Sequence, residues 1–113
     1  ALGKRMDHAL GNIHILAKAL SYNIFCEIVD IHNRIYVIDK SIALEKEKVY
    51  GKYVSLIPLT SFVYGLTLNG FKYIVNDYKL SIGKSLGISN EIIENFASIE
   101  LKKGILIVIE SKD

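Results

Sequence analysis

The chain has 113 residues, of which 50% are hydrophobic and 23% are charged, and its formal net charge is +2. This length suits one domain with a single core, and the apolar content excludes an intrinsically disordered chain. The charge is too small, and its lysine and glutamate residues too scattered, to favour a nucleic-acid-binding protein.

The longest uninterrupted apolar run, residues 105–109, is far too short to cross a bilayer. The first twelve residues lack the apolar core of a signal peptide. The single cysteine, Cys26, cannot form an internal disulfide and is interpreted as a buried thiol. We therefore predict a soluble protein of the reducing cytoplasm, with no membrane partner.

An amphipathic helix is predicted over residues 7–20, where apolar residues recur at helical spacing and Tyr22-Asn23 ends the pattern. Strands are predicted over 24–30 and 34–39, joined by a turn in which Asn33 suits a positive φ. Residues 41–50 combine strand-like alternation with good helix formers. Strand is favoured there because strands surround the segment.

The remaining pattern is β. A strand over 53–57 ends at Pro58, which has no N–H to donate. The other expected elements are strands at 62–68 and 71–75 in a hairpin across Asn69-Gly70, a strand at 78–82, one helical turn at 91–94 capped by Ser89 or Asn90, and a hairpin of 97–101 with 105–110.

Gly104 suits the positive φ of the last turn, and residues 105–109 do not alternate, so this strand is placed centrally with both faces buried. Several short strands at this spacing predict a β-sandwich or barrel, on which the helix either packs or stands apart.

The stretch from Gly65 to Asn90 carries the candidate ligand site. Tyr73 shares a predicted strand face with Phe71 and Val75, and Ser89 and Asn90 place a hydroxyl and an amide close together. An aromatic plate beside donors and acceptors suits a flat heteroaromatic ligand. The alternative is a core tyrosine, with Ser89 and Asn90 acting as helix-cap or Asx-turn residues.

Three strings in this stretch, GLTLNGFKY, KLSIG and SLGISNE, resemble the C-terminal thiamine-binding domain of bacterial thiamine pyrophosphokinases. The N-terminal GKRMDHALGN resembles that family's Gly-x-Arg-x-Asp-His-x-x-x-Asn segment, and IELKKGILIVIESKD fits its last two strands. The resemblance implies a mainly β fold: a jelly-roll-like β-sandwich at 41–113, preceded by a helix and strand hairpin at 1–40 left over from an α/β catalytic domain.

The family resemblance implies pyrophosphoryl transfer from ATP to thiamine with release of AMP, using Mg²⁺. It also implies a homodimer in which each thiamine site is shared between subunits. An upstream nucleotide-binding half would be absent here, so we expect this chain alone to be inactive. The alternatives are a non-catalytic small-ligand-binding module and a β-domain that serves only dimerisation.

The resemblance also implies roles for single residues. Arg5 and Asp7 match the segment that lines the cleft for the nucleotide phosphates, with Arg5 as a fork for phosphate oxygens and Asp7 as a Mg²⁺ ligand. The alternative for Asp7 is a helix N-cap. Tyr73 stands where the family often has Trp and would stack on the thiamine pyrimidine, which Ser89 and Asn90 would recognise through hydrogen bonds. His8 and Asn12 also fit the segment, without a deducible role.

Overall fold

The computed structural model describes residues 2–83 and 89–112. Within these ranges one helix precedes nine strands: α1 (Leu2–Ser21), β1 (Glu27–Val29), β2 (Asn33–Ile38), β3 (Ile42–Glu45), β4 (Tyr53–Pro58), β5 (Phe62–Asn69), β6 (Tyr78–Ser81), β7 (Asn90–Glu91), β8 (Phe96–Glu100) and β9 (Leu106–Ser111). The mainly β fold predicted from the sequence is confirmed.

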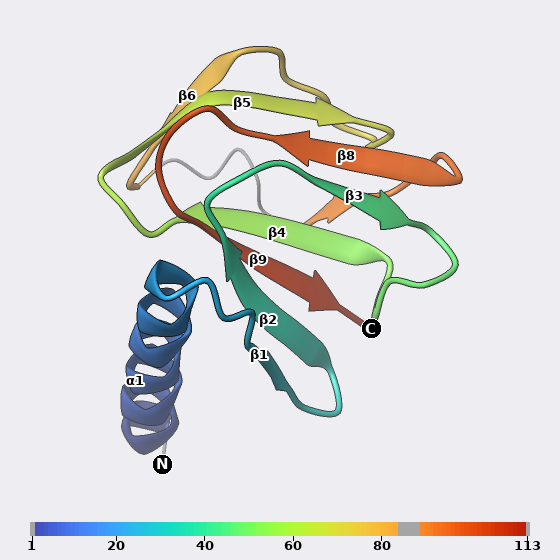
Figure 1. Cartoon of the computed structure of the whole chain (residues 1–113). Helices are drawn as coiled ribbons and strands as arrows, with labels where there is room; N and C mark the ends of the chain where they lie inside the picture. The colour runs from blue at the N-terminus through green and yellow to red at the C-terminus, as the bar shows by residue number, and fades with distance from the viewer. Residues whose placement is uncertain (1, 84–88, 113) are drawn as a thin grey trace.

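The strands form two antiparallel sheets that face each other as a sandwich (Figure 1). One sheet has the order β1-β2-β9-β4-β7 and the other has the order β3-β8-β5-β6. Side chains alternate along each strand, so one face of each sheet fills the space between them. The buried side chains there include Tyr36, Leu56, Leu66, Leu80, Ile99 and Val108.

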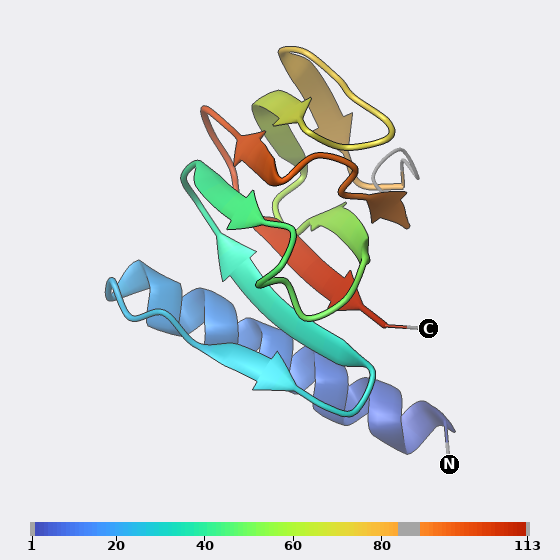
Figure 2. The same ribbon diagram turned by 90° about the vertical axis from the view of Figure 1, so that its right-hand side faces the viewer.

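β9 is central, because it pairs with β2 on one side and with β4 on the other. Leu106 and Val108 of β9 face the sandwich core, whereas Ile107 packs with Val37 against Leu16 of α1. The helix thus covers the outer face of this sheet (Figure 2). Burial on both faces of 105–109, predicted from its lack of alternation, is confirmed.

α1 ends as expected at Tyr22-Asn23. Asn23 adopts a positive φ of 61° and its N–H donates to the Leu20 carbonyl, while the Ile24 N–H donates to the Ala19 carbonyl. These two bonds form a Schellman cap. Among the described residues, no helix combines the length and apolar character that a bilayer crossing requires.

The start of α1 differs from the prediction, because the helix is already formed at Leu2 rather than beginning at residue 7. Leu2, Lys4 and Arg5 are good helix formers, and no proline interrupts the segment. Asp7 therefore lies within the helix, and its interpretation as an N-cap is wrong.

The turn before β2 also differs from the prediction, because Asn33 has no positive φ and already belongs to the strand. The Asp30 carboxylate closes this turn instead, accepting from the His32 N–H at 2.8 Å and the Asn33 N–H at 2.7 Å. This is an Asx turn, which needs no left-handed residue. Two backbone hydrogen bonds to the carboxylate lower the pKa of Asp30.

The predicted hairpin across Asn69-Gly70 is wrong. β5 continues through Asn69, and residues 71–75 form no strand beyond a bridge between Phe71 and Ile92. Gly70 has a φ of 81°, but the reason lies in the fold, because a Cβ there would stand 2.4 Å from the carbonyl oxygen of Phe96. Close approach to β8, rather than a two-residue turn, requires this glycine.

Two further predictions are wrong at the end of the chain. Residues 90 and 91 form strand β7 against β4, not the cap and start of a helical turn. β8 and β9 form no hairpin, because they belong to different sheets. The connection between them is held by the main chain of β5. The Tyr64 N–H donates to the Lys103 carbonyl, and the Tyr64 carbonyl accepts from the Lys102 N–H. Gly104, at a φ of 111°, lets the chain cross between the layers.

All six residues of β2 pair with β9, so both sides of the expected boundary at residue 40 share one sheet. The division into 1–40 and 41–113 stays a prediction.

Candidate ligand site around Tyr73

Asn90 fixes the main chain at Tyr73. Its side chain is 1% exposed on the edge strand β7, next to β4. The Asn90 Oδ1 accepts from the Tyr73 N–H at 3.0 Å, and its Nδ2 donates to the Tyr73 carbonyl at 2.7 Å. Oδ1 also accepts from the Glu91 N–H at 2.9 Å. The amide thereby satisfies both backbone polar groups of Tyr73, as a neighbouring strand would.

Backbone hydrogen bonds join the Tyr73 loop, residues 70–77 between β5 and β6, to β7 and to the residues that follow β7. The Lys72 N–H donates to the Glu91 carbonyl at 2.8 Å, and the Ile93 N–H donates to the Gly70 carbonyl at 2.9 Å. Phe71, between them, is buried in the sandwich core. The segment before Tyr73 is therefore rigidly placed although it belongs to no regular strand.

The Tyr73 phenol itself is 57% exposed, so it is not part of the core. The Lys72 ammonium lies 5.5 Å from the ring centroid, and Ile74 and Ile93 are exposed as well. An exposed ring on a fixed main chain offers a face on which a flat aromatic group can stack.

Ser89 directly precedes Asn90 and has a positive φ of 53°. Its N–H donates to the Ser55 Oγ of β4 at 2.9 Å. Its exposed hydroxyl makes no hydrogen bond to the residues that the structure describes. Of these two residues, Ser89 thus presents an exposed hydroxyl to a ligand, whereas the Asn90 amide is buried and bonded to the main chain of Tyr73. Residues 85–88 of the SLGISNE string lie outside the described residues.

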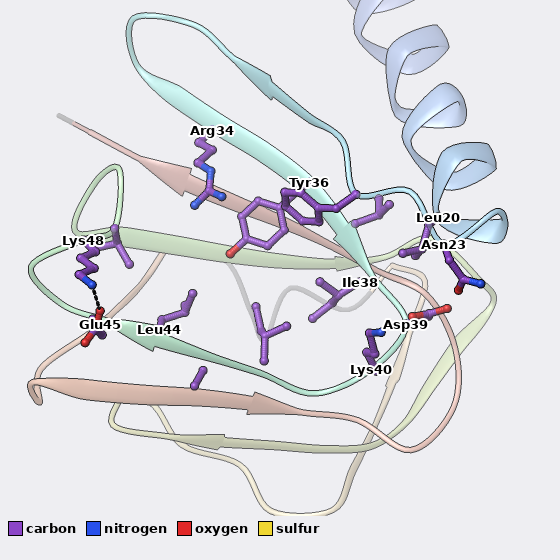
Figure 3. Close-up of a pocket in the computed structure, with 15 residues that line it drawn as sticks. Leu20, Asn23, Arg34, Tyr36, Ile38, Asp39, Lys40, Leu44, Glu45 and Lys48 are labelled. Carbon is purple, nitrogen blue, oxygen red and sulfur yellow. Dashed lines mark ion pairs between the residues drawn. The ribbon is translucent and has the colours of Figure 1, made fainter.

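A separate cavity of 420 Å³ lies between β2 and β3 (Figure 3). Apolar side chains make most of its wall, including Phe25, Tyr36, Ile38, Leu44 and Val49. None of the predicted site residues lines this cavity.

A buried carboxylate stands behind the cavity wall. Glu110 is 0% exposed and accepts from the Tyr36 hydroxyl at 2.6 Å and the Tyr50 N–H at 2.8 Å. Arg34 Nη1 lies 3.3 Å from Glu110, and Arg34 Nε donates to Glu27 at 2.5 Å. Burial, and then the hydrogen bond to Glu110, raises the pKa of Tyr36. Burial is the largest effect on Arg34 and opposes its charge, but the two carboxylates raise the pKa of its guanidinium overall.

Sequence reasoning singled out neither Arg34 nor Glu110. One signal was present, because residue 110 has the same strand parity as Leu106 and Val108, which face the core. A carboxylate in a core-facing position needs partners, and these come from strands distant in the sequence.

A family model described as thiamin pyrophosphokinase, vitamin B1 binding domain, matches residues 39–106. The chain belongs to the thiamine pyrophosphokinase family. A thiamine pyrophosphokinase of Bacillus subtilis (strain 168) is 39% identical over 112 residues, which are 98% of this chain and 52% of that protein.

Solved thiamine pyrophosphokinase structures share the fold. The enzyme from Bacillus subtilis matches with a TM-score of 0.89 at 39% identity, over 95% of this chain and 50% of that one. The protein from Geobacillus thermodenitrificans matches with a TM-score of 0.84 at 36% identity, over 96% of this chain and 49% of that one. The chain thus spans about half the length of these thiamine pyrophosphokinases.

The N-terminal motif of the thiamine pyrophosphokinase resemblance lies apart from the Tyr73 loop. Arg5 and Asp7 belong to α1, which packs on β2 and β9, whereas Asn90 lies on β7 at the far edge of the sheet (Figure 2). One chain therefore does not bring the two motifs together. In the part of the chain that the structure describes, no group of three or more His, Cys, Asp or Glu side chains could hold a metal.

Proposed function

We propose that this chain provides the thiamine-binding part of a thiamine pyrophosphokinase, which transfers the pyrophosphoryl group of ATP to the hydroxyl of thiamine and releases AMP. The observation that carries this proposal is the exposed Tyr73 ring on a main chain held by Asn90, within the segment matched as a vitamin B1 binding domain. The thiamine pyrimidine stacks on this ring, and Ser89 and Asn90 help to recognise it through hydrogen bonds.

Arg5 and Asp7 serve the phosphate side of the reaction in this proposal. The Arg5 guanidinium is a fork for phosphate oxygens, and the Asp7 carboxylate is a ligand for Mg²⁺. Mg²⁺ would neutralise charge on the transferred phosphate groups. Holding the thiamine hydroxyl in line with the phosphorus is then the main task of the protein residues.

The distance between the two motifs supports a homodimer with shared sites. Because α1 and β7 lie at different places on the sheet, a complete site takes its Tyr73 loop from one subunit and its phosphate-binding residues from the other. Because the chain spans about half the length of the thiamine pyrophosphokinases it matches, we expect the chain alone to bind thiamine weakly and to make no thiamine diphosphate. We place the enzyme in the cytoplasm, whose reducing conditions suit the free thiol of Cys26.

Calorimetry with thiamine tests the role of Tyr73. We expect Tyr73→Ala to weaken binding about tenfold, as loss of a stacking ring commonly does. Tyr22→Ala is the matched control, because Tyr22 is 68% exposed at the end of α1, and it should bind like the wild type. Equal affinities of the wild type and Tyr73→Ala would remove Tyr73 from the site.

A second assay tests whether the chain alone is active. The purified chain is incubated with ATP, Mg²⁺ and thiamine, and thiamine diphosphate is measured by chromatography. No product is expected from the chain alone. Formation of thiamine diphosphate would show that this chain, as a monomer or as a dimer, is sufficient for the reaction, and would refute the expectation that it is inactive alone.

A further inference from the structure

The cavity between β2 and β3 has the size and wall of a ligand site, apart from the Tyr73 loop. Its 420 Å³ falls within the range of small-molecule sites, which are typically about 300–1,000 Å³. It lies along the open side of the sandwich, where β3 is the edge strand of its sheet. Figure 3 shows Tyr36 and Ile38 of β2 and Leu44 of β3 directed into the same space.

Two aromatic rings form one wall of this cavity. The Phe25 and Tyr36 rings lie 5.7 Å apart between centroids and are inclined at 53°. Tyr36 is buried, but Phe25 is 56% exposed although it packs on a core residue. An exposed ring at the edge of a cavity presents an apolar face to whatever enters, and aromatic ligands pack well on such faces.

Arg34 supplies hydrogen-bond donors for a ligand in the cavity. Its Nε and Nη1 are bonded to Glu27 and Glu110, while Nη2 makes no hydrogen bond to any residue in the described ranges. Two N–H donors therefore remain on a side chain that lines the cavity. Because Arg34 already stands between two carboxylates, a further anion would be repelled by them. A cation would find only donors on this guanidinium.

The other charges of the lining do not change this conclusion. Lys48 pairs with Glu45 at 2.8 Å, and the lining carries one further acid, Asp39, and one further base, Lys40, so these four charges sum to zero. A neutral ligand with a hydrogen-bond acceptor fits the cavity better than a charged one.

We propose that this cavity is a second ligand site, for a small flat aromatic molecule without net charge whose carbonyl or ring nitrogen accepts from Arg34 Nη2 while its ring lies along Phe25 and Tyr36. The site is independent of thiamine binding, because none of Tyr73, Ser89 and Asn90 contributes to its wall.

Three probes of the same shape and different charge test the proposal: benzamide, benzoate and benzamidine, each titrated into the ¹⁵N-labelled chain. Benzamide should shift the amide signals of residues 34–49 and leave those of 72–74 and 89–91 in place. It should bind about fivefold more tightly than either charged probe. Shifts centred on the Tyr73 loop, no shifts at all, or benzoate binding as tightly as benzamide would each overturn the proposal.

Two variants localise the binding. Val49→Phe fills the cavity from a half-buried position outside the strands and should abolish the benzamide shifts. Phe25→Ala removes the exposed ring and should weaken binding about fivefold. Phe96→Ala, which removes a 68% exposed ring from the other sheet, should leave binding unchanged.

The amide spectrum of each variant shows whether its fold is kept, and Phe25→Ala stays informative if the larger residue at 49 perturbs packing. Sedimentation at several protein concentrations reveals any second copy seated on the cavity. Unchanged benzamide binding in Phe25→Ala would overturn the proposal, as would a dimer of the wild type that Val49→Phe dissociates.

Discussion

Removal of the Asn90 amide tests most directly how the Tyr73 loop is held. In Asn90→Ala, the Tyr73 N–H and carbonyl lose partners at 3.0 and 2.7 Å, and the Glu91 N–H loses one at 2.9 Å. At about 1 kcal/mol for each of the two bonds to the loop, with a further contribution from the third, we expect unfolding to become easier by about 2–3 kcal/mol. For a chain of this size the melting temperature should fall by about 8–12 °C.

Thermal and urea unfolding followed by circular dichroism measure this loss. Asn95→Ala is the matched control, because Asn95 is exposed and its side chain makes no hydrogen bond to the described residues, so a change within about 0.5 kcal/mol is expected. Thiamine affinity should fall in Asn90→Ala together with stability, since Tyr73 is released. A stability loss no larger than that of the control would refute the claim that the Asn90 amide holds the main chain of Tyr73 in place.

The isosteric variant Asn90→Asp tests which side-chain atom at this position accepts a hydrogen bond and which donates one. A carboxylate keeps the acceptor toward the Tyr73 N–H but places a second oxygen against the Tyr73 carbonyl. Burial and this carbonyl raise the pKa of the introduced carboxyl above its unfolded value of about 3.9. Its penalty is therefore small below pH 4 and grows as the pH rises toward the folded-state pKa. A stability difference from the wild type that stays constant between pH 3.5 and pH 7 would contradict this geometry.

Asp30→Asn should be less stable than the wild type at pH 7, because two backbone N–H groups lower the pKa of Asp30 below 3.8. Urea unfolding midpoints should show this difference vanishing as the pH falls through that lowered pKa. Glu110→Ala should lower the unfolding free energy by about 3 kcal/mol, since it leaves buried donors unpaired, whereas the exposed Glu47→Ala should change it by less than about 0.5 kcal/mol. Gly70→Ala should lower the unfolding free energy by at least about 2 kcal/mol, because of the φ of 81° and the close approach to β8. Gly11→Ala should raise it by about 1 kcal/mol, because nothing lies near a Cβ at this helical position. Equal effects of the two substitutions would refute the role of close approach.

Periodicity predicted the elements whose environment is uniform along their length. The 3.6-residue apolar repeat predicted α1, and the continuous apolar run at 105–109 predicted a strand covered on both faces, as β9 is by the core and by α1. Pro58 ends β4 in the structure as in the prediction. In these cases one local rule and the tertiary fold point to the same answer.

Turn signals were less informative, because a positive φ does not say which strand comes next. Gly70 and Gly104 both have the left-handed backbone that the sequence suggested, yet neither closes a two-strand hairpin. One glycine lets β5 approach β8, and the other lets the chain pass from one sheet to the other. Sheet membership depends on long-range packing, which a short sequence window does not contain.

The site prediction was also partly accessible. Tyr73 and Asn90 were expected close together, and the structure joins them through the side-chain amide of Asn90. Their contacts with thiamine, like the roles of Arg5 and Asp7, stay predictions. Glu110 was out of reach, because its partner Arg34 lies 76 positions earlier in the chain and no local pattern connects the two.

The position of β9 has a consequence for how the polypeptide acquires its shape during synthesis. The strands on either side of it leave the ribosome well before it does, and they cannot meet without it. Such late, long-range closure favours slow folding and leaves unpaired edges exposed in the interim. A nascent chain stalled before residue 106 would thus expose unpaired edges of β2 and β4. Chaperones that bind extended apolar segments would bind there.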